Sequence, residues 1–244
     1  MRRLLFLLLL STSAFAQWRS VAPGVDHRRI GRVDVARVDL RHANTKAIAS
    51  GKADRGATVS AFARKHKALI AINGDYFDEQ RWPIGKAGGT CGVWWEGKRV
   101  GRKQGLVSVG AGRVEIQRNT QSARGWARGA VSGWPLLVDG CTSVKDIPGS
   151  DHFTKVKVPR TAVATSRDGK TMYLVVAEAM TLPELAAFLV KELGACRAMN
   201  LDGGMSSTMW VGNGIVAGSD IAVGNHLAVV GAADYSACVE RKSQ

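Results

Sequence analysis

The segment TLPELAAFLVKELGACRAMNLDGG, residues 181–204, contains a helix, a strand and a polar loop in direct succession. Thr181 and Glu184 match a capping box, in which each side chain bonds to the backbone of the other residue at the start of a helix. Apolar residues then recur at helical spacing as far as Gly194, which is a typical helix-ending residue. The short strand that follows, 196–199, stops abruptly at Asn-Leu-Asp-Gly-Gly. A helix with one core-facing side and a strand that ends in a polar loop are therefore predicted.

The same order of elements occurs earlier in the chain. Thr58 is placed to cap a helix over 59–67, the apolar strand 68–72 follows, and this strand runs into the polar segment NGDYFD at 73–78. Acids and amides at the end of a strand stand on a rigid support at the mouth of a cleft, where functional sites are common. The two strand-to-loop transitions are therefore the main organisational feature of the sequence.

Short β-type runs separated by glycine turns make up most of the remaining chain. Val33 to Leu40 alternates apolar and polar residues, and four hairpins are predicted, over 92–100, 106–116, 161–177 and 211–218. We find no linker, charge block or internal repeat. The sequence thus predicts one α+β domain over 17–244, with a mixed, largely antiparallel sheet core and flanking helices.

The first sixteen residues, MRRLLFLLLLSTSAFA, have the form of a secretory signal peptide. Two arginines precede a leucine-rich core, and Ala14-Phe15-Ala16 gives the small-residue pattern before a cleavage site. No later segment approaches the ~18 consecutive apolar residues of a membrane helix, so no membrane anchor is expected. An exported protein, periplasmic or extracellular, is predicted.

Cysteine usage fits an exported protein, because four cysteines suggest disulfide bonds in an oxidising compartment. Their spacing does not match a zinc site. Three pairings are possible, and proximity in the sequence favours Cys91–Cys141 with Cys196–Cys238.

A formal net charge of +14 favours anionic partners, such as phosphorylated glycans or envelope polymers. The basic residues are scattered along the chain, so nucleic acid is not specifically indicated. A surface that is simply solvated by lysines and arginines is an equally good interpretation.

The loop after the second strand combines groups that suit phosphate or sugar oxygens. Its glycines allow a ligand to approach the backbone amides, its hydroxyls can hydrogen-bond oxygens, and its aspartate supplies a charge. An ordinary tight turn, with a hydrogen bond from the aspartate side chain, is the alternative for an isolated Asp-Gly-Gly. The candidate residues are Asp202, Gly203, Gly204, Ser206 and Ser207.

Further candidates stand outside this loop. Asn73, Asp75 and Asp78 follow the first strand, although an Asn-Gly turn with solvated acids would look the same. Arg160 enters a strand after a proline, where its guanidinium could grip a phosphate with two hydrogen bonds, although a surface arginine is the default. Glu178 is a third candidate carboxylate, with a structural role as its simpler interpretation.

Other chemistries have weaker support. Ser206 lacks the G-x-S-x-G setting of serine hydrolases, and His226 precedes an apolar strand like a core or rim residue. No histidine pair has zinc-protease spacing. Asp75, Asp78 and Asp202 could together hold a divalent cation, although no segment resembles an EF-hand loop.

Seven segments together resemble the phosphodiester glycosidase domain family, and they span the chain from about Ala68 to Val230. The long loop segment, with its helix and the PRTA segment before it, is the most specific of them. The segments are AINGDYFD (71–78), PIG (83–85), SGWPLLVDG (132–140), VPRTAVA (158–164), TLPELAAFLVKELGA (181–195), AMNLDGGMSSTMWVGNGIV (198–216) and VGNHLAVV (223–230).

The resemblance implies hydrolysis of a sugar-1-phosphodiester at the glycosidic C–O bond, giving free sugar and a phosphomonoester, without metal or cofactor. It implies that Arg160 and the segment Gly203–Ser206 bind the phosphate. Asp202 and Asp75 would orient or activate water, or one of them would be the nucleophile. Asn73 and Ser207 would bind sugar hydroxyls.

The chain departs from the family pattern at three places. Met205 stands where the motif has a third glycine, Asp75 stands where many relatives have glycine, and 177–180 is shorter than the family's segment. Two other functions stay open on the sequence: a non-catalytic module that binds anionic glycan or envelope polymer, and a metal-dependent phosphodiesterase.

Overall fold

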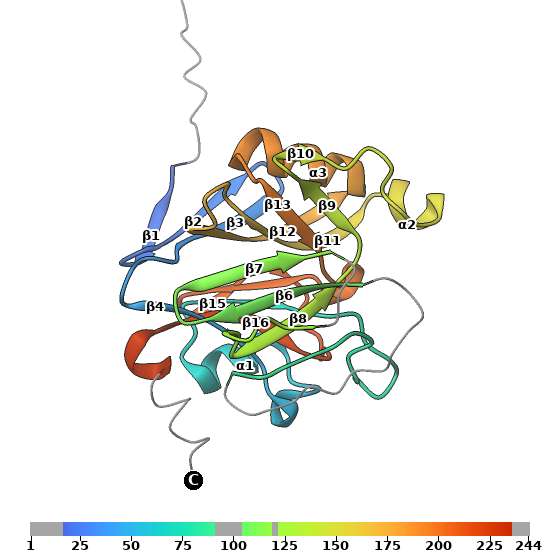
Figure 1. Ribbon diagram of the computed structural model, residues 1–244. Helices are drawn as coiled ribbons and strands as arrows, with labels where there is room; N and C mark the ends of the chain where they lie inside the picture. The colour runs from blue at the N-terminus through green and yellow to red at the C-terminus, as the bar shows by residue number, and fades with distance from the viewer. Residues whose placement is uncertain (1–16, 91–103, 119–121, 236–244) are drawn as a thin grey trace, which may run out of the picture.

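A computed structural model describes residues 17–90, 104–118 and 122–235 of the 244-residue chain. Two large sheets face each other across the main core, and one helix covers the outer side of each, with α3 at the top and α1 at the bottom of the view (Figure 1). Every strand pairing in the described part of the chain is antiparallel.

The larger sheet has eight strands, and α3 (Leu182–Leu193) packs on it. The capping box between Thr181 and Glu184 starts this helix, and Gly194 ends it in a left-handed conformation with φ of 61°. In spatial order the strands are β1 (Arg19–Ala22), β2 (Val25–Ile30), β3 (Val33–Asp39), β12 (Thr171–Met180), β11 (Val158–Thr165), β13 (Arg197–Asn200), β9 (Leu136–Asp139) and β10 (Thr142–Ser143).

The second sheet has five strands and carries α1 (Val59–His66), whose first turn is capped by the Thr58 hydroxyl. A third, three-stranded sheet contacts β4 (Thr45–Ala49) of the second. In spatial order the strands of the second sheet are β15 (Gly214–Gly218), β14 (Thr208–Val211), β5 (Ile70–Asn73), β16 (His226–Gly231) and β4 (Thr45–Ala49). Those of the third are β7 (Arg113–Gln117), β6 (Gly105–Gly110) and β8 (Gly129–Gly133).

Three short elements complete the description: η1 (Lys52–Asp54), α2 (Asp151–Lys155) and η2 (Gly204–Ser206). The sequence signals for α2 are weak because a five-residue helix has no room for an apolar period. None of the helices in the described ranges is long and apolar enough to cross a membrane.

Three apolar clusters hold these layers together. The largest fills the space between the facing sheets and includes Val38, Ile72 and Leu174. A second buries the apolar stripe of α3 against the eight-stranded sheet, and a third buries Phe62 of α1 against the five-stranded sheet. Each sheet is therefore apolar on both faces where a helix covers it.

The structure confirms the α+β class and most of the predicted elements. The helices over 59–67 and 181–194 form, and so do the hairpins over 106–116, 161–177 and 211–218. The hairpin predicted over 92–100 lies outside the described residues.

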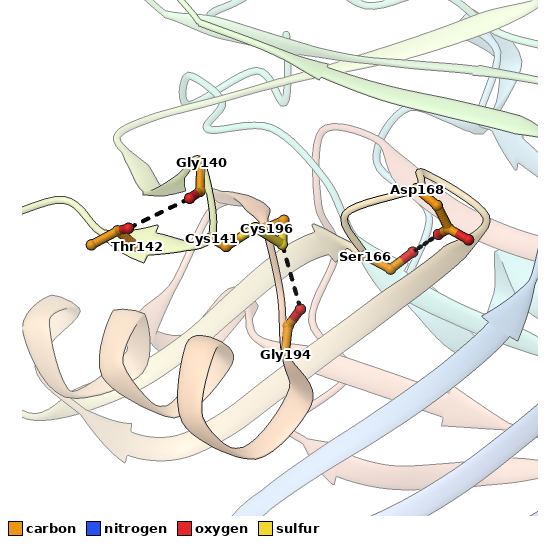
Figure 2. Close-up of a disulfide and its surroundings, with 7 residues drawn as sticks. All are labelled: Gly140, Cys141, Thr142, Ser166, Asp168, Gly194 and Cys196. Carbon is orange, nitrogen blue, oxygen red and sulfur yellow. Dashed lines mark hydrogen bonds between the residues drawn. A yellow bond between two sulfur atoms is a disulfide. The ribbon is translucent and has the colours of Figure 1, made fainter.

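The predicted cysteine pairing is wrong. Cys141 is bonded to Cys196, across 55 residues of sequence (Figure 2). The reason is strand pairing, since β13 lies beside β9 with Arg197 opposite Asp139, so the turns that carry the two cysteines meet. Cys91 and Cys238 lie outside the described residues.

Candidate active site

The polar segments after β5 and β13 lie together where the two large sheets meet. Asn73, the last residue of β5, is fully buried, and its Nδ2 donates to the Asp202 carbonyl at 2.8 Å. Its Oδ1 accepts from the Thr161 hydroxyl at 2.8 Å and from the Thr208 backbone at 3.2 Å. Thr161 belongs to the eight-stranded sheet and Thr208 to the other, so one buried carboxamide joins the two sheets beside Asp202.

Asn200, the last residue of β13, plays a similar part. Its Nδ2 donates to the Tyr76 hydroxyl at 2.6 Å and to the Trp134 carbonyl at 2.9 Å. The Tyr76 hydroxyl donates in turn to the Trp134 carbonyl at 2.8 Å. This network fixes the Tyr76 ring next to the loop that carries Asp202.

Gly74 shows why the first loop contains a glycine. Its carbonyl accepts from the Asp202 backbone at 3.0 Å, and a Cβ at this position would stand 2.3 Å from Asn225 Oδ1. Any larger residue would collide with Asn225, the residue before β16.

Asp75 is buried behind these loops, with 1% of its surface exposed. Its Oδ1 accepts from the Ser132 backbone at 2.6 Å, and its own N–H donates to Asn225 Oδ1 at 2.7 Å. Its Oδ2 accepts no hydrogen bond of ordinary geometry within the described structure. Burial raises the pKa of Asp75 well above its usual value, and the charge of Asp202 adds to this, against lowering by Asn225 and Ser132.

Asp202 is partly exposed, in contrast, and its carboxyl reaches an open pocket. Its Oδ1 accepts from the Gly203 backbone at 2.9 Å. Burial raises the pKa of Asp202 to about 6, while the Ser206 hydroxyl, the Gly203 N–H and the charge of Arg81 lower it. The two carboxyls thus differ in access, because Asp202 faces the pocket and Asp75 lies inside the protein.

The pocket, of about 240 Å³, has two unlike walls. One is formed by Asp202 and the backbone of Gly203 and Gly204. The second glycine adopts a left-handed φ of 63° that favours glycine, with open space around it. The pocket's remaining lining residues are Tyr76, His152, Phe153, Val156, Val158 and Arg160, of which Tyr76, Phe153 and the two valines form an apolar wall.

Arg160 lines this pocket, but most of its bonding capacity is used within the protein. Its Nε donates to the Met180 carbonyl at 3.1 Å, and its Nη2 donates to the carbonyls of Phe153 and Val156 at 2.7 and 3.0 Å. Arg160 therefore holds α2 and the residue after it against β11.

The hydroxyls predicted to bind substrate do not line this pocket. Ser206 and Ser207 are both buried, and the Ser207 hydroxyl has no hydrogen-bond partner in the described part of the chain. Met205 between the glycines and these serines points outward, with 77% of its surface exposed. It does not fill the pocket.

Two of the weaker candidates, Asp78 and Glu178, make structural contacts. The Asp78 carboxylate accepts from the backbone of Gln80 and Trp82 and so shapes its own turn. Glu178 pairs with Arg29 and Arg32.

Three residues near the carboxyls were not predicted. Ser132 and Asn225 act through single contacts with Asp75, and no local pattern marks them, although both fall in segments that resemble the family. Arg81 has a left-handed φ of 64°, and its guanidinium lies 4.8 Å from the centre of the Phe77 ring. Because Arg81 is distant from Asp202 along the chain, no local sequence pattern predicts that the two residues lie near each other.

The described residues contain no group of three or more His, Cys, Asp or Glu side chains arranged to hold a metal ion. The carboxylates of Asp75, Asp78 and Asp202 thus do not form a cluster of that kind in this structure.

The family model for phosphodiester glycosidases matches residues 66–230, which is more than half of the chain. The chain belongs to the phosphodiester glycosidase family. The match contains β5, the loop with Asp75, β13 and the loop with Asp202, so every residue of the site described above lies within the family domain.

Three solved structures share the fold. The catalytic domain of zebrafish N-acetylglucosamine-1-phosphodiester α-N-acetylglucosaminidase, auto-inhibited by its pro-peptide, has a TM-score of 0.62 and 18% identity, over 84% of this chain and 77% of that one. A Burkholderia pseudomallei protein described as exported has a TM-score of 0.61 and 16% identity, over 84% and 74%.

A hypothetical protein from Synechocystis has a TM-score of 0.59 and 17% identity, over 88% of this chain. The chain covers 61% of the length of that protein. No curated protein sequence matches the chain. Because the sequence identities are this low, the three similarities show a shared fold and nothing more.

Proposed function

We propose that this member of the phosphodiester glycosidase family is an exported hydrolase that cleaves a sugar-1-phosphodiester at the glycosidic C–O bond. The observation that carries the proposal is the placement of Asp202 in the pocket wall, beside two bare glycines and in front of the buried Asp75. The zebrafish relative, whose name describes a phosphodiester glycosidase, supports the same reaction class.

In this proposal Asp202 is the carboxylate that meets the sugar. A pKa of about 6 leaves it mostly ionised at pH 7, so it can attack C1 or accept a proton from the attacking water. The C1–O bond breaks with its electron pair passing to the phosphate oxygen, and the water oxygen ends on C1. The leaving phosphate is stable as an anion, so stabilising its charge matters more than protonating it.

Asp75 has a positioning role in this scheme. Its burial favours the neutral form, and its contacts are with Ser132 and Asn225. When the Asp75 carboxyl is neutral, the Asp202 carboxylate can stay ionised. A negative charge on Asp75 would repel the charge on Asp202.

The phosphate would lie against the backbone of Gly203 and Gly204, near the positive charge of Arg81. Arg160 would keep the apolar wall in place through its three carbonyl contacts. Asn73, whose polar atoms are used by Asp202, Thr161 and Thr208, would position the loop instead of binding sugar. Ser206 and Ser207 would offer hydroxyls to the substrate after a local movement of their loop.

Export is supported by the form of residues 1–16 and by the Cys141–Cys196 disulfide, which is typical of oxidising compartments. We expect the mature chain to begin at Gln17 and to act in the periplasm or outside the cell, on a phosphate-linked sugar or anionic glycan.

The test is hydrolysis of a panel of sugar-1-phosphodiesters by the mature protein, with and without a chelator. We expect turnover of at least one member, unchanged by chelator and reduced at least ~10³-fold by Asp202→Asn. Loss of activity with chelator would support a metal-dependent phosphodiesterase. Salt-dependent binding without turnover, unchanged in Asp202→Asn, would support a non-catalytic binding module.

A further inference from the structure

The apolar wall of the pocket binds nothing in the proposed function. Tyr76, Phe153, Val156 and Val158 form it, while His152 and Arg160 are the polar residues of the same lining. Arg160 uses its Nε and Nη2 within the protein. The side chains of Phe153, Val156 and Val158 offer no hydrogen-bonding group to the hydroxyls of a sugar ring, so their chemistry suits a hydrocarbon.

This wall is built before any ligand arrives. The Phe153 ring stacks on Trp134 with 5.1 Å between ring centres, and the Tyr76 ring lies 6.5 Å from Phe153. The Tyr76 hydroxyl is anchored to the Trp134 carbonyl, and Arg160 binds the carbonyls of Phe153 and Val156. A fixed apolar surface loses little conformational entropy when it binds.

One of the few exposed large apolar side chains lies in this pocket. Only three large apolar residues are exposed among the described ones, namely Val156 (38%), Met205 (77%) and Val216 (37%). Val156 lines the pocket, and Met205 is the residue after Gly204, which also lines it. Large apolar groups left in water beside a pocket commonly mark a binding surface.

We propose that this wall is a subsite for an apolar chain attached to the phosphate, so that the substrate is a sugar-1-phosphodiester with an alkyl or isoprenoid group on its other side. This inference rests on the proposed function. The sugar would lie at Asp202, the phosphate at the glycine backbone, and the chain against Phe153, Val156 and Val158.

The probe is n-octyl phosphate below its micellar concentration, compared with methyl phosphate by calorimetry on the mature protein. Each methylene buried at the wall should improve affinity about fourfold, so we expect octyl phosphate to bind at least ~10-fold more tightly. Val156→Ser should reduce that preference by about tenfold.

Val216→Ser is the matched control, because Val216 is the same residue type with the same exposure but does not line the pocket. It should leave the preference unchanged. Equal affinity for the two phosphates, or an octyl preference that is as large in Val156→Ser as in the wild type, would overturn the subsite.

Turnover separates this inference from the proposed function. Methyl and octyl diesters of each panel sugar are compared by kcat/KM, and we expect the octyl diester to be favoured at least ~10-fold. Turnover of both diesters at equal kcat/KM would leave the glycosidase standing and remove the subsite. A wall-dependent octyl preference in binding, without turnover, would support the subsite and contradict the glycosidase.

Discussion

At the scale of single residues, the proposed catalysis depends on the different environments of two carboxyls. Asp202 keeps access to the pocket with a pKa of about 6, whereas Asp75 is enclosed and has a pKa well above its usual value. Catalysis that needs ionised Asp202 should therefore show a kcat/KM that rises with pH up to a plateau, with a midpoint near 6. A kcat/KM that stays flat between pH 4.5 and 7.5 would contradict this assignment.

The raised pKa of Asp202 also has a cost in stability. Because the folded state favours the protonated form, stability falls as pH rises from about 4 to about 6. Asp202→Asn should thus be more stable than the wild type above pH 6, by on the order of 2 kcal/mol or several degrees in Tm. The difference should disappear below pH 4. Thermal unfolding across this range checks it, and an equal Tm at pH 8 would show that ionised Asp202 costs nothing.

Asp75 should respond differently to the same substitution. If its carboxyl is neutral in the active enzyme, Asp75→Asn keeps a group of the same shape and charge, and kcat should fall no more than ~100-fold. The midpoint near pH 6 in kcat/KM should persist, since it belongs to Asp202. An Asp75→Asn variant as inactive as Asp202→Asn would make Asp75 the reacting carboxylate.

The sequence alone predicted which kinds of side chain stand in the two loops. It did not predict the contacts between segments that are distant along the chain. The pairing of acids, glycines and hydroxyls after two strands predicted the pocket side that holds Asp202, Gly203 and Gly204. Arg160 was predicted as a phosphate ligand because of its residue type. Its actual contacts are backbone carbonyls of α2 and β12, whose positions depend on the folded chain.

At the scale of elements, the site exists because Asn73 joins β5 to the loop after β13. Asn73→Ala would leave the Thr161 hydroxyl, the Thr208 N–H and the Asp202 carbonyl without their partner, at about 1–3 kcal/mol for each buried group. We expect a loss of at least ~3 kcal/mol in the free energy of unfolding, measured by denaturant titration.

Thr161→Val is the matched control for this prediction, because it removes one of the three contacts and preserves side-chain volume. It should cost about 1 kcal/mol. Equal effects of the two substitutions would show that the carboxamide does not join the sheets.

Strong local signals explain which elements could be predicted. The capping box of α3, the glycine that ends it and the glycine turns of three hairpins act within a few residues, so the sequence contains them in full. The order of strands in the sheets depends on pairings over long separations, and α2 is too short for a periodic pattern. The wrong cysteine pairing has the same origin, because β9 and β13 are neighbours in space and distant in sequence.

At the scale of the whole molecule, the disulfide and the pocket stand at opposite ends of β13. Cys196 precedes this strand and Asp202 follows it, while the bond to Cys141 closes a long loop through β11, β12 and α3 (Figures 1 and 2). Replacing both cysteines with serine should cost about 2–4 kcal/mol of stability, seen as a lower Tm. At a temperature where both proteins are folded, kcat should change less than twofold. A tenfold fall in kcat of the folded variant would show that the bond also shapes the site.

The most direct test of the central claim is the position of ¹⁸O after hydrolysis of a sugar-1-phosphodiester in ¹⁸O-labelled water. Cleavage at the glycosidic C–O bond places the label in the free sugar, and mass spectrometry of the two products locates it. We expect label in the sugar alone, formed by the wild type and lost in Asp202→Asn. Label in the phosphomonoester would mean that the P–O bond breaks, and it would contradict the assignment of Asp202 to the sugar carbon.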